Sequence, residues 1–422
     1  MRTFNSVALL ITIYFPPEPS GGSTGAWNRA MILHKIGYSV FVICGFPAYP
    51  SGKVTDPKYK GKLLYVENMD PFIVIRLRLL SIRHKGYIKR LILFLNFLFL
   101  TLFYLPKIIG ITGRIGIVYA RAPILFSSVT GFVYSKIMKS FFIFEVPDLW
   151  PEELVAFRTY LSPIIMPLGK VVAKLSYALP DIIVTVSELA AEYICKEYRP
   201  KASVYSIPVG VDPNKFPRLS KDNSRVDLIK KKILPEHLGN KFIILYAGLL
   251  SNAQQIENLA YAAEKLKGEK EIVILIIGEG EEKQKLEQLK LEYNLNNFYL
   301  LPFQPRNIMP TIISAADTCT VLLSSEPIFD IALPTKFYEY LACCKPIIGV
   351  CKGELANIIN SNNIGQTVNV GDIDKLVSII KDMKNSPALM QIMENNSYNI
   401  LQKFSLDSIS SKLLDILKKE MM

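Results

Sequence analysis

The sequence contains few of the residues from which catalytic metal centres and histidine-based triads are built. Histidine occurs only three times in 422 residues, at positions far apart in the chain. The six cysteines include no C-x-x-C pair, and three of them lie in or beside apolar segments. We interpret them as the reduced, buried thiols of a cytosolic protein. Because no carboxylate, histidine or cysteine cluster has the spacing of metal ligands, we expect neither a metal nor a cofactor.

Acidic residues are missing from one long internal stretch. No Asp or Glu lies between Asp70 and Glu145, although this stretch is rich in lysine and arginine. Inside it, the uncharged run Leu91–Pro106 has basic residues on both sides. A transmembrane helix needs about 20 apolar residues, so this run is somewhat short, and Asn96 interrupts it. We therefore expect an interfacial helix or a core helix.

The basic and apolar region 71–144 suits an anionic membrane surface, which attracts each nearby basic residue with about 1 kcal/mol. Nucleic acid is the competing polyanion. The long aliphatic component and the lack of a nucleic-acid motif argue against it. A helix buried between two domains, with its basic residues simply solvated, is the structural alternative.

The first residues, MRTFNSVALLITIYFPPEPSGG, have a composition close to that of a signal peptide. Their apolar run ends in Pro-Pro-Glu-Pro, whereas a signal peptide ends in small residues at its cleavage site. We interpret Val7–Ile13 as a buried first strand that runs into a glycine loop. Gly21 and Gly22 in that loop would let the backbone approach a bound phosphate, although a plain turn into a helix is the simpler reading.

Apolar runs alternate with amphipathic segments along the whole chain, which is typical of parallel sheets buried on both faces. The expected strands are Val7–Ile13, Val40–Cys44, Ile115–Tyr119, Phe141–Val146, Ile182–Val186, Val204–Ile207, Phe242–Tyr246, Ile272–Ile277, Phe298–Leu301, Thr318–Leu322 and Pro346–Gly349. Two β-α-β series, separated by a charged and strand-poor region, predict an α/β protein of two doubly wound domains.

We place the boundary between these domains in a linker near Pro208–Asp212. The N-terminal domain would cover 1–208, and the C-terminal domain 209–403. The last helix, within 404–422, would pack back on the first domain. In such folds ligands bind beyond the carboxyl ends of the strands, so we expect the site in a cleft that the two domains face.

The stretch LPTKFYEYLACCKPIIGV, which starts at Leu333, predicts an anion site. Pro334 suits a first helical position, so the amides of Thr335, Lys336 and Phe337 would be free to bind a diphosphate. Glu339, one turn further on, would accept hydrogen bonds from a vicinal diol such as a ribose. The competing interpretation is an ordinary surface ion pair between Lys336 and Glu339.

As a whole, the chain resembles retaining GT-B glycosyltransferases of the family 4 type, also called group 1 glycosyltransferases. The resemblance covers nearly the whole chain and is carried by segments in a particular order. These are YFPPEPSGG, LHKIGYSVFVICGFPAYPSGKV, EVPDLWPEELV, VTVSELAAEYI with SIPVGVDPNKF, LYAGLLSNAQQIENL, IIGEGEEKQKLEQL and LPTKFYEYLACCKPIIGV. Relatives of this type build polysaccharides and lipid-linked oligosaccharides.

The resemblance implies an E-x7-E pattern in which the second glutamate, here Glu339, binds the nucleotide ribose. The first glutamate should stand at Ile331, which is apolar, so Asp330 or Glu326 would have to reach the donor sugar. The resemblance also implies an Arg and a Lys for the diphosphate in the loop after Gly248. This loop has neither residue.

Phosphate binding would therefore rely on backbone amides, Ser251, Asn252 and Lys336. Gly278 would lie at the edge of the nucleotide, and the base would rest near Phe303 and Gln304. The G-x-G of IIGEGEEK is a false dinucleotide fingerprint, because a lysine replaces the third glycine and three glutamates surround the turn.

In EVPDLWPEELV, the residues Asp148, Trp150 and Glu152 would face the cleft. Asp148 or Glu152 would bind or help deprotonate the acceptor hydroxyl. Helix capping explains the same acids equally well. Together with Asp330, these two acids form the catalytic set that we expect.

The resemblance implies an enzyme of class EC 2.4, a retaining hexosyltransferase. It would move a sugar from a UDP- or GDP-linked donor to a lipid-linked or glycan acceptor. The expected location is cytoplasmic, peripheral on the inner face of the cell membrane. Two alternatives stay open: a non-catalytic glycosyltransferase-like partner subunit, and a nucleotide-sugar 2-epimerase.

Overall fold

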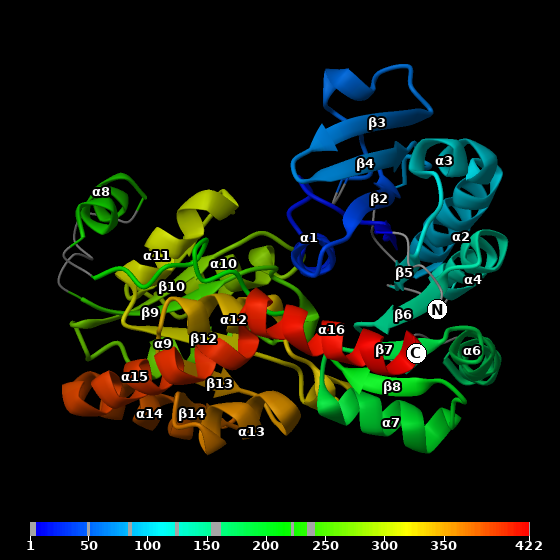
Figure 1. Ribbon diagram of the computed structural model, residues 1–422. Helices are drawn as coiled ribbons and strands as arrows, with labels where there is room; N and C mark the ends of the chain where they lie inside the picture. The colour runs from blue at the N-terminus through cyan, green and yellow to red at the C-terminus, as the bar shows by residue number, and fades with distance from the viewer. Residues whose placement is uncertain are drawn as a thin grey trace. The chain divides into compact units, whose positions relative to one another are not determined.

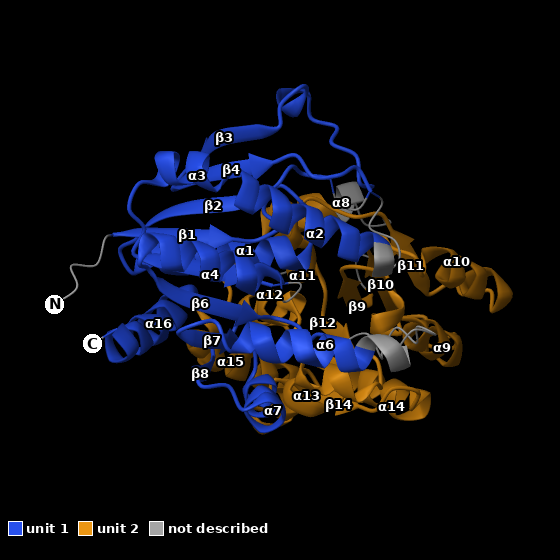
Figure 2. Ribbon diagram, turned by 90° about the vertical axis from the view of Figure 1, so that its right-hand side faces the viewer, with its two compact units in different colours: residues 1–209, 406–422 blue, residues 210–405 orange. Residues whose placement is uncertain are grey.

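The computed structural model describes residues 6–48, 51–82, 87–122, 126–152, 162–220, 223–233 and 241–421. It divides into two compact units, which are coloured separately in Figure 2. Unit 1 consists of Met1–Val209 and Leu406–Met422, and unit 2 is Gly210–Ser405. The change from unit 1 to unit 2 falls in the segment where the sequence suggested a linker.

Unit 1 is built on an eight-stranded sheet with the order β3-β4-β2-β1-β5-β6-β7-β8 (Figure 1). Its strands are β1 (Val7–Ile11), β2 (Ser39–Gly45), β3 (Leu64–Met69), β4 (Phe72–Leu77), β5 (Ile117–Arg121), β6 (Phe141–Val146), β7 (Ile182–Thr185) and β8 (Ser203–Ser206). All neighbouring strands are parallel except β3, which runs antiparallel to β4.

The described helices of unit 1 connect these strands and end with the last helix of the chain. They are α1 (Gly21–Lys35), α2 (Tyr87–Phe103), α3 (Leu105–Thr112), α4 (Phe126–Met138), α6 (Ser162–Tyr177), α7 (Glu188–Tyr198) and α16 (Leu406–Met421). Helix α16 packs on α1, and the two are joined by an ion pair of 2.6 Å between Lys35 Nζ and Asp407 Oδ1. Leu406 and Leu413 of α16 share a buried core with Ile32 and Leu33 of α1.

Unit 2 is built on a six-stranded parallel sheet with the order β11-β10-β9-β12-β13-β14. Its strands are β9 (Phe242–Ala247), β10 (Ile272–Ile277), β11 (Phe298–Leu301), β12 (Thr318–Leu322), β13 (Ile347–Val350) and β14 (Gly365–Val368). Its described α-helices are α8 (Ser224–Ile233), α9 (Glu257–Lys265), α10 (Lys283–Glu292), α11 (Met309–Ala315), α12 (Thr335–Ala342), α13 (Gly353–Ser361), α14 (Ile373–Asn385) and α15 (Pro387–Phe404). This strand order is the doubly wound order of a Rossmann-like domain.

The two doubly wound sheets, parallel except for the edge strand β3, confirm the predicted fold class. Every strand expected from the apolar runs forms, with ends that differ by at most two residues. Three strands were missed. β3 carries polar residues along a partly exposed edge, and β14 has only one large apolar residue. β4 lies inside the basic region 71–144, which we interpreted as one membrane-binding segment without dividing it into strands and helices.

The apolar start of the chain is a strand in the interior of a sheet. β1 pairs with β2 on one side and β5 on the other, and Ala8 to Ile11 are fully buried. A strand that must lie between two neighbours needs apolar side chains on both faces, which explains the uninterrupted run.

A buried charge network ties three segments of unit 1 together. Glu145, at the end of β6, is completely buried and lies between two arginines. Its Oε1 is 3.0 Å from Arg29 Nε, and its Oε2 is 3.3 Å from Arg121 Nε. Arg29 also donates to the carbonyls of Ile207 and Pro208, where unit 1 ends. The network therefore fixes the exit of the chain from unit 1 against α1 and the sheet.

Removing the shared carboxylate should destabilise unit 1 strongly. Glu145→Ala leaves two buried guanidinium groups without their anion, which costs about 3–5 kcal/mol. The expected result is a clear fall in the thermal unfolding midpoint. Glu281→Ala, which removes an exposed carboxylate from unit 2, should leave the midpoint almost unchanged. Equal midpoints for both variants would show that the network contributes little.

Candidate functional site

The topology of unit 2 determines where a ligand can bind. β9 is flanked by β10, which follows it in the chain, and by β12, which comes later. At such a reversal the loops after the two central strands separate and leave a crevice beyond their carboxyl ends. The loops after β9 and β12 are connected by a hydrogen bond of 2.9 Å from Ser324 N to Ala253 O. The candidate site is at this crevice.

Two glycines allow the loops after β9 and β10 to touch. A Cβ atom on Gly278 would lie 1.9 Å from the carbonyl oxygen of Gly248, and a Cβ on Gly280 would lie 2.0 Å from that of Leu250. Leu250 N in turn donates to Glu279 O at 2.9 Å. The G-x-G segment thus serves backbone packing, which agrees with our rejection of it as a dinucleotide fingerprint.

Helix α12 begins beside the crevice. Pro334 occupies the N-cap position and the helix starts at Thr335, one residue later than predicted. Phe337 N donates to Pro334 O at 3.0 Å, so the amide of Phe337 is not available to an anion as we had expected. The helix is fixed to the sheet through Tyr340, whose hydroxyl accepts from Ala247 N at 2.9 Å at the end of β9.

Lys336 reaches from α12 across to the loop after β9. Its Nζ donates to Tyr246 Oη at 2.7 Å and to Gln254 Oε1 at 3.1 Å, and it lies 3.9 Å from the centroid of the Tyr246 ring. A Cβ on Gly248 would be 2.9 Å from this nitrogen, and Gly248 has a φ of +149° that favours glycine. The amine therefore lies against the glycine loop.

The surroundings of Lys336 weaken its hold on a proton. Burial lowers the pKa of the Lys336 amine to about 7, and the carboxylate of Glu339 partly opposes this effect. An anion placed beside the amine would favour the charged form and raise the pKa again.

Glu339 pairs with an arginine, and not with Lys336 as the competing interpretation supposed. Glu339 Oε1 is 2.7 Å from Arg306 Nη2, and the glutamate side chain is 15% exposed whereas the arginine is 50% exposed. Burial raises the pKa of the Glu339 carboxyl, and Arg306 lowers it. The Arg306 guanidinium also lies over the Phe216 ring, 5.2 Å from its centroid.

The remaining predicted donor residues lie in the loops after β9 and β11 and differ in exposure. Ser251 precedes the short 3₁₀ helix η3 (Asn252–Gln254), in which Asn252 is exposed. Phe303 is 49% exposed in the loop after β11. Gln304 Nε2 donates to Pro302 O at 3.1 Å. Their roles toward a nucleotide stay predictions.

Asp330 lies in the 3₁₀ helix η5 (Pro327–Ile331), which packs against the start of α13. A Cβ on Gly353 would be 2.0 Å from the Asp330 carbonyl oxygen, so the backbones are in close contact there. Burial, and to a lesser degree the Asp330 carboxylate, raises the pKa of Cys351 to about 12.

In unit 1, Gly21 and Gly22 form the first turn of α1, which Ser20 caps by accepting from Ser23 N at 3.1 Å. Gly22 O accepts from Arg121 Nη1 at 3.0 Å. Gly25 lies closer to Arg121 than either of them, because a Cβ there would be 2.5 Å from Arg121 Nη2. The sequence pattern did not single out Gly25.

The acids predicted to face the acceptor differ in environment. Asp148 is exposed, whereas Trp150 and Glu152 are buried, with 7% and 9% of their surface accessible. Glu152 Oε1 accepts from the hydroxyls of Tyr193 and Tyr198 on α7. Glu152 thus anchors α7, and of the two acids Asp148 is the one open to a substrate. The helix start that would test the capping alternative lies outside the described residues.

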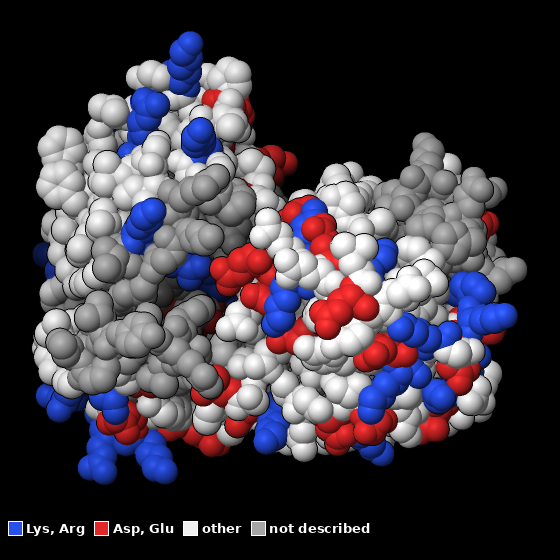
Figure 3. Space-filling view, turned by 180° about the vertical axis from the view of Figure 1, so that it is seen from behind, with Lys and Arg blue, Asp and Glu red and all other residues white. Residues whose placement is uncertain are grey.

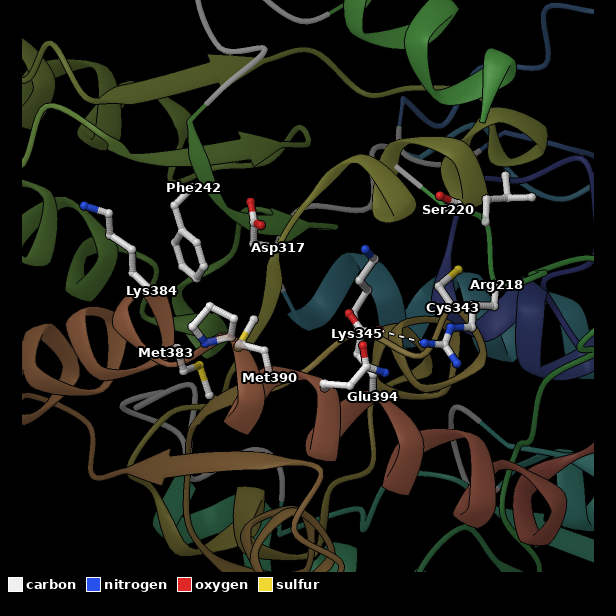
Figure 4. A pocket seen from close by; sticks show the side chains of 13 residues that line it. Arg218, Ser220, Phe242, Asp317, Cys343, Lys345, Met383, Lys384, Met390 and Glu394 are labelled. Carbon is white, nitrogen blue, oxygen red and sulfur yellow. Dashed lines mark hydrogen bonds and ion pairs between the residues drawn. The ribbon is translucent and has the colours of Figure 1, made fainter. Parts of the chain in front are cut away.

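A separate pocket lies at the opposite edge of the unit 2 sheet. Figure 4 shows its lining, which includes Phe242 at the start of β9, Asp317 before β12 and Lys345 before β13. Its volume is about 530 Å³, and an ion pair of 2.8 Å joins Arg218 and Glu394 at its rim. Because it opens at the amino ends of the strands, it is distinct from the candidate site. Within the described ranges, no group of three metal-ligating side chains comes together.

Known proteins resemble this chain over part of its sequence and in its fold. Residues 229–400 match the family model "Glycosyl transferases group 1". WcaI of Escherichia coli (strain K12), which is named as a colanic acid biosynthesis glycosyl transferase, is 31% identical over 118 residues. That alignment covers 28% of each chain. WbjE of Pseudomonas aeruginosa, which is named as a glycosyltransferase, is 28% identical over 155 residues, or 36% of this chain and 37% of that protein. The chain thus matches only about 28–37% of the length of these two curated relatives.

Solved structures resemble the whole chain. Sucrose-phosphate synthase from Thermosynechococcus elongatus has a TM-score of 0.75 at 18% identity, with 99% of both chains covered. HepE from Anabaena, in complex with UDP-glucose, has a TM-score of 0.69 at 14% identity and covers 98% of this chain and 99% of its own. At such low identity these likenesses establish the fold.

The protein therefore has the GT-B fold, with two Rossmann-like α/β units. Its C-terminal unit carries the sequence pattern of the group 1 glycosyl transferases over 229–400.

Sequence reasoning missed three residues that shape the site. Tyr246 and Gln254 hold the Lys336 amine, and Tyr340 positions the helix that carries it. Tyr246 and Tyr340 stand inside apolar segments and look like core residues. Gln254 belongs to the loop from which we singled out only Ser251 and Asn252.

The Lys336 amine should titrate near neutral pH. In a lysine side-chain NMR titration, one resonance should show a midpoint near 7, because burial favours the neutral amine. That resonance should be missing from Lys336→Arg and present in Lys267→Arg, which changes an exposed lysine elsewhere in unit 2. Inorganic pyrophosphate should raise the midpoint. A midpoint that pyrophosphate leaves unchanged would separate Lys336 from any anion site.

Proposed function

We propose that the protein is a retaining glycosyltransferase that moves a sugar from a nucleotide-sugar donor to a lipid-linked or glycan acceptor at the cytoplasmic face of the membrane. The observation that carries the proposal is the cluster of Lys336, Glu339 and Arg306 at the strand-order reversal of unit 2. The family match over 229–400 and the UDP-glucose bound to HepE, a structure of the same fold, support a nucleotide-sugar donor.

In the proposed complex the donor diphosphate lies along the loop after β9. The Lys336 amine supplies the positive charge that this loop lacks, and Ser251 and nearby backbone amides add hydrogen bonds. Glu339 binds the ribose hydroxyls one turn further along α12. The nucleotide base rests near Phe303.

The proposed transfer proceeds on one face of the sugar. The acceptor oxygen forms a bond to the anomeric carbon as the bond from that carbon to the leaving phosphate breaks. The phosphate accepts the proton of the acceptor hydroxyl. The protein stabilises the charge on the leaving diphosphate and aligns the two substrates, and Asp148 orients the acceptor hydroxyl. The proposal includes no metal and no further cofactor.

The experiment that tests the function is a screen of labelled UDP- and GDP-sugars with membrane extract as the acceptor source. Mass spectrometry should show a sugar added to an acceptor, and proton NMR of the product should show the anomeric configuration of the donor. Inversion would overturn retention. A lack of transfer from every donor, with intact binding of UDP or GDP, would favour a non-catalytic subunit.

Glu339→Ala should weaken donor binding while the protein remains folded. Loss of a charged hydrogen-bond acceptor for the ribose costs about 1.5–3 kcal/mol, which is roughly a 10- to 200-fold increase in Kd. Calorimetry with the donor that the screen identifies measures this effect. Glu292→Ala removes a glutamate of α10 as the matched control and should bind normally. Equal affinities for the two variants would reject the ribose assignment.

A further inference from the structure

Three helices of unit 1 form a layer over one side of its sheet. α4 contacts both α2 and α6, and Figure 2 looks onto this layer. The inner sides of the helices are buried; Leu93 and Phe97 of α2, for example, are 3% and 4% exposed. The outer sides carry large apolar residues.

These exposed residues recur at helical spacing. We define the apolar face by the exposed hydrophobic side chains of α2, α4 and α6. They are Ile92, Leu95, Phe99, Phe103, Val129, Ile137, Leu168, Val171 and Leu175. On α2 the steps are three, four and four residues, and on α6 three and four, so each set lies along one side of its helix. Phe99 and Phe103 stack with ring centroids 6.0 Å apart.

The face carries charge of one sign. α2, α3, α4 and α6 contain no Asp or Glu. The exposed charged residues on these helices are Lys89, Arg90, Lys107, Lys136 and Lys174. Lys170 lies among them and forms an ion pair with Glu197 of α7. Figure 3, which shows the molecule from behind, has isolated basic side chains and few acidic ones at the upper left, whereas acidic and basic side chains mix on the right.

We propose that this apolar face docks on an anionic phospholipid surface, with its basic residues at the lipid phosphates. Exposed aromatic and aliphatic side chains next to cations suit the boundary between headgroups and acyl chains. Nucleic acid binds through cations and stacking aromatic rings, and the broad aliphatic part of this face would add nothing to such binding. The sequence predicted a basic apolar membrane segment within 71–144; the structure extends the surface to α6, which lies outside that segment.

In this proposal the helices lie on the lipid surface with their outer sides and do not cross the membrane. In the described parts of the chain, no single helix has the length and apolar composition needed to cross a membrane. The pair Lys89–Phe103 and Leu105–Thr112 meets that requirement only when taken together, and it is bent by 62°.

Vesicle co-sedimentation of the purified full-length protein tests the proposal. The protein should sediment with vesicles of phosphatidylcholine and phosphatidylglycerol at low salt and be released at high salt. Vesicles of phosphatidylcholine alone should retain much less. Equal recovery with both vesicle types, or none with either, would overturn the proposal.

Variants locate the contact. Phe99→Ser with Phe103→Ser should weaken vesicle binding by about tenfold or more, because two exposed apolar side chains are lost from the contact. Leu168→Ser with Leu175→Ser should do the same from α6. Leu291→Ser, which changes the 81% exposed leucine of α10 in unit 2, is the matched control and should bind as the wild type does.

Charge is tested separately. Lys136→Glu and Lys174→Glu should each reduce binding to the anionic vesicles by about fivefold or more, since each basic residue near the surface contributes on that scale. Lys267→Glu in unit 2 should not reduce it.

Light scattering on the wild type and on the variant with Phe99→Ser and Phe103→Ser tests whether the face instead binds a second copy of the chain. A wild-type dimer that the variant converts to a monomer would assign the face to a second copy of the chain and overturn the proposal.

Unchanged UDP or GDP binding by the vesicle-defective variants would show that docking and the proposed donor site are separate properties. The docking proposal concerns unit 1 and its experiment needs no turnover. Its failure is therefore distinguishable from a failure of the proposed function.

Discussion

The reversal of strand order beside β9 is the constraint on which the candidate site depends. β9 pairs with β10 on one side and β12 on the other, and open α/β sheets bind their ligands beyond the carboxyl ends of the strands at such a reversal. Glycines at Gly278 and Gly280 let the loops after β9 and β10 meet on one flank. On the other flank, α12 is tied to the end of β9 by the hydrogen bond from Ala247 N to the Tyr340 hydroxyl.

This arrangement places a cation at a loop that has none of its own. The loop after β9 has no lysine or arginine of its own, yet the amine of Lys336 is held there by Tyr246 and Gln254. The same enclosure lowers the pKa of Lys336 to about 7. A diphosphate that enters the crevice would therefore bind together with a proton, because its charge stabilises the ammonium form.

Unit 1 uses buried charge for a different purpose. Glu145 forms ion pairs with Arg29 and Arg121. Arg29 also donates to a backbone carbonyl at the chain exit, and Arg121 to one in the first turn of α1. These charged side chains therefore bind to partners inside the unit. Its outer helices, in contrast, leave apolar side chains and lysines exposed on one face, which is why we assign that face to a lipid surface.

The sequence by itself determined the two α/β units and the place of their strands. Strands buried on both faces must be uninterrupted apolar runs, and those runs are visible without coordinates. It also indicated α12 and Glu339, because a proline before a helix start and a family pattern are local signals. The strands β3 and β14 were not predicted, because strands at the edge of a sheet can be partly polar.

Only the tertiary structure decided which side chains meet. The contact between Arg306 and Glu339 joins residues that are 33 positions apart, and the contact between Lys336 and Gln254 joins residues 82 positions apart. No local sequence pattern predicts either contact. It also separated Glu152, enclosed by two tyrosines, from the exposed Asp148, although both acids look alike in the sequence. Burial and partners depend on packing between distant segments, and the chain does not encode them in short stretches.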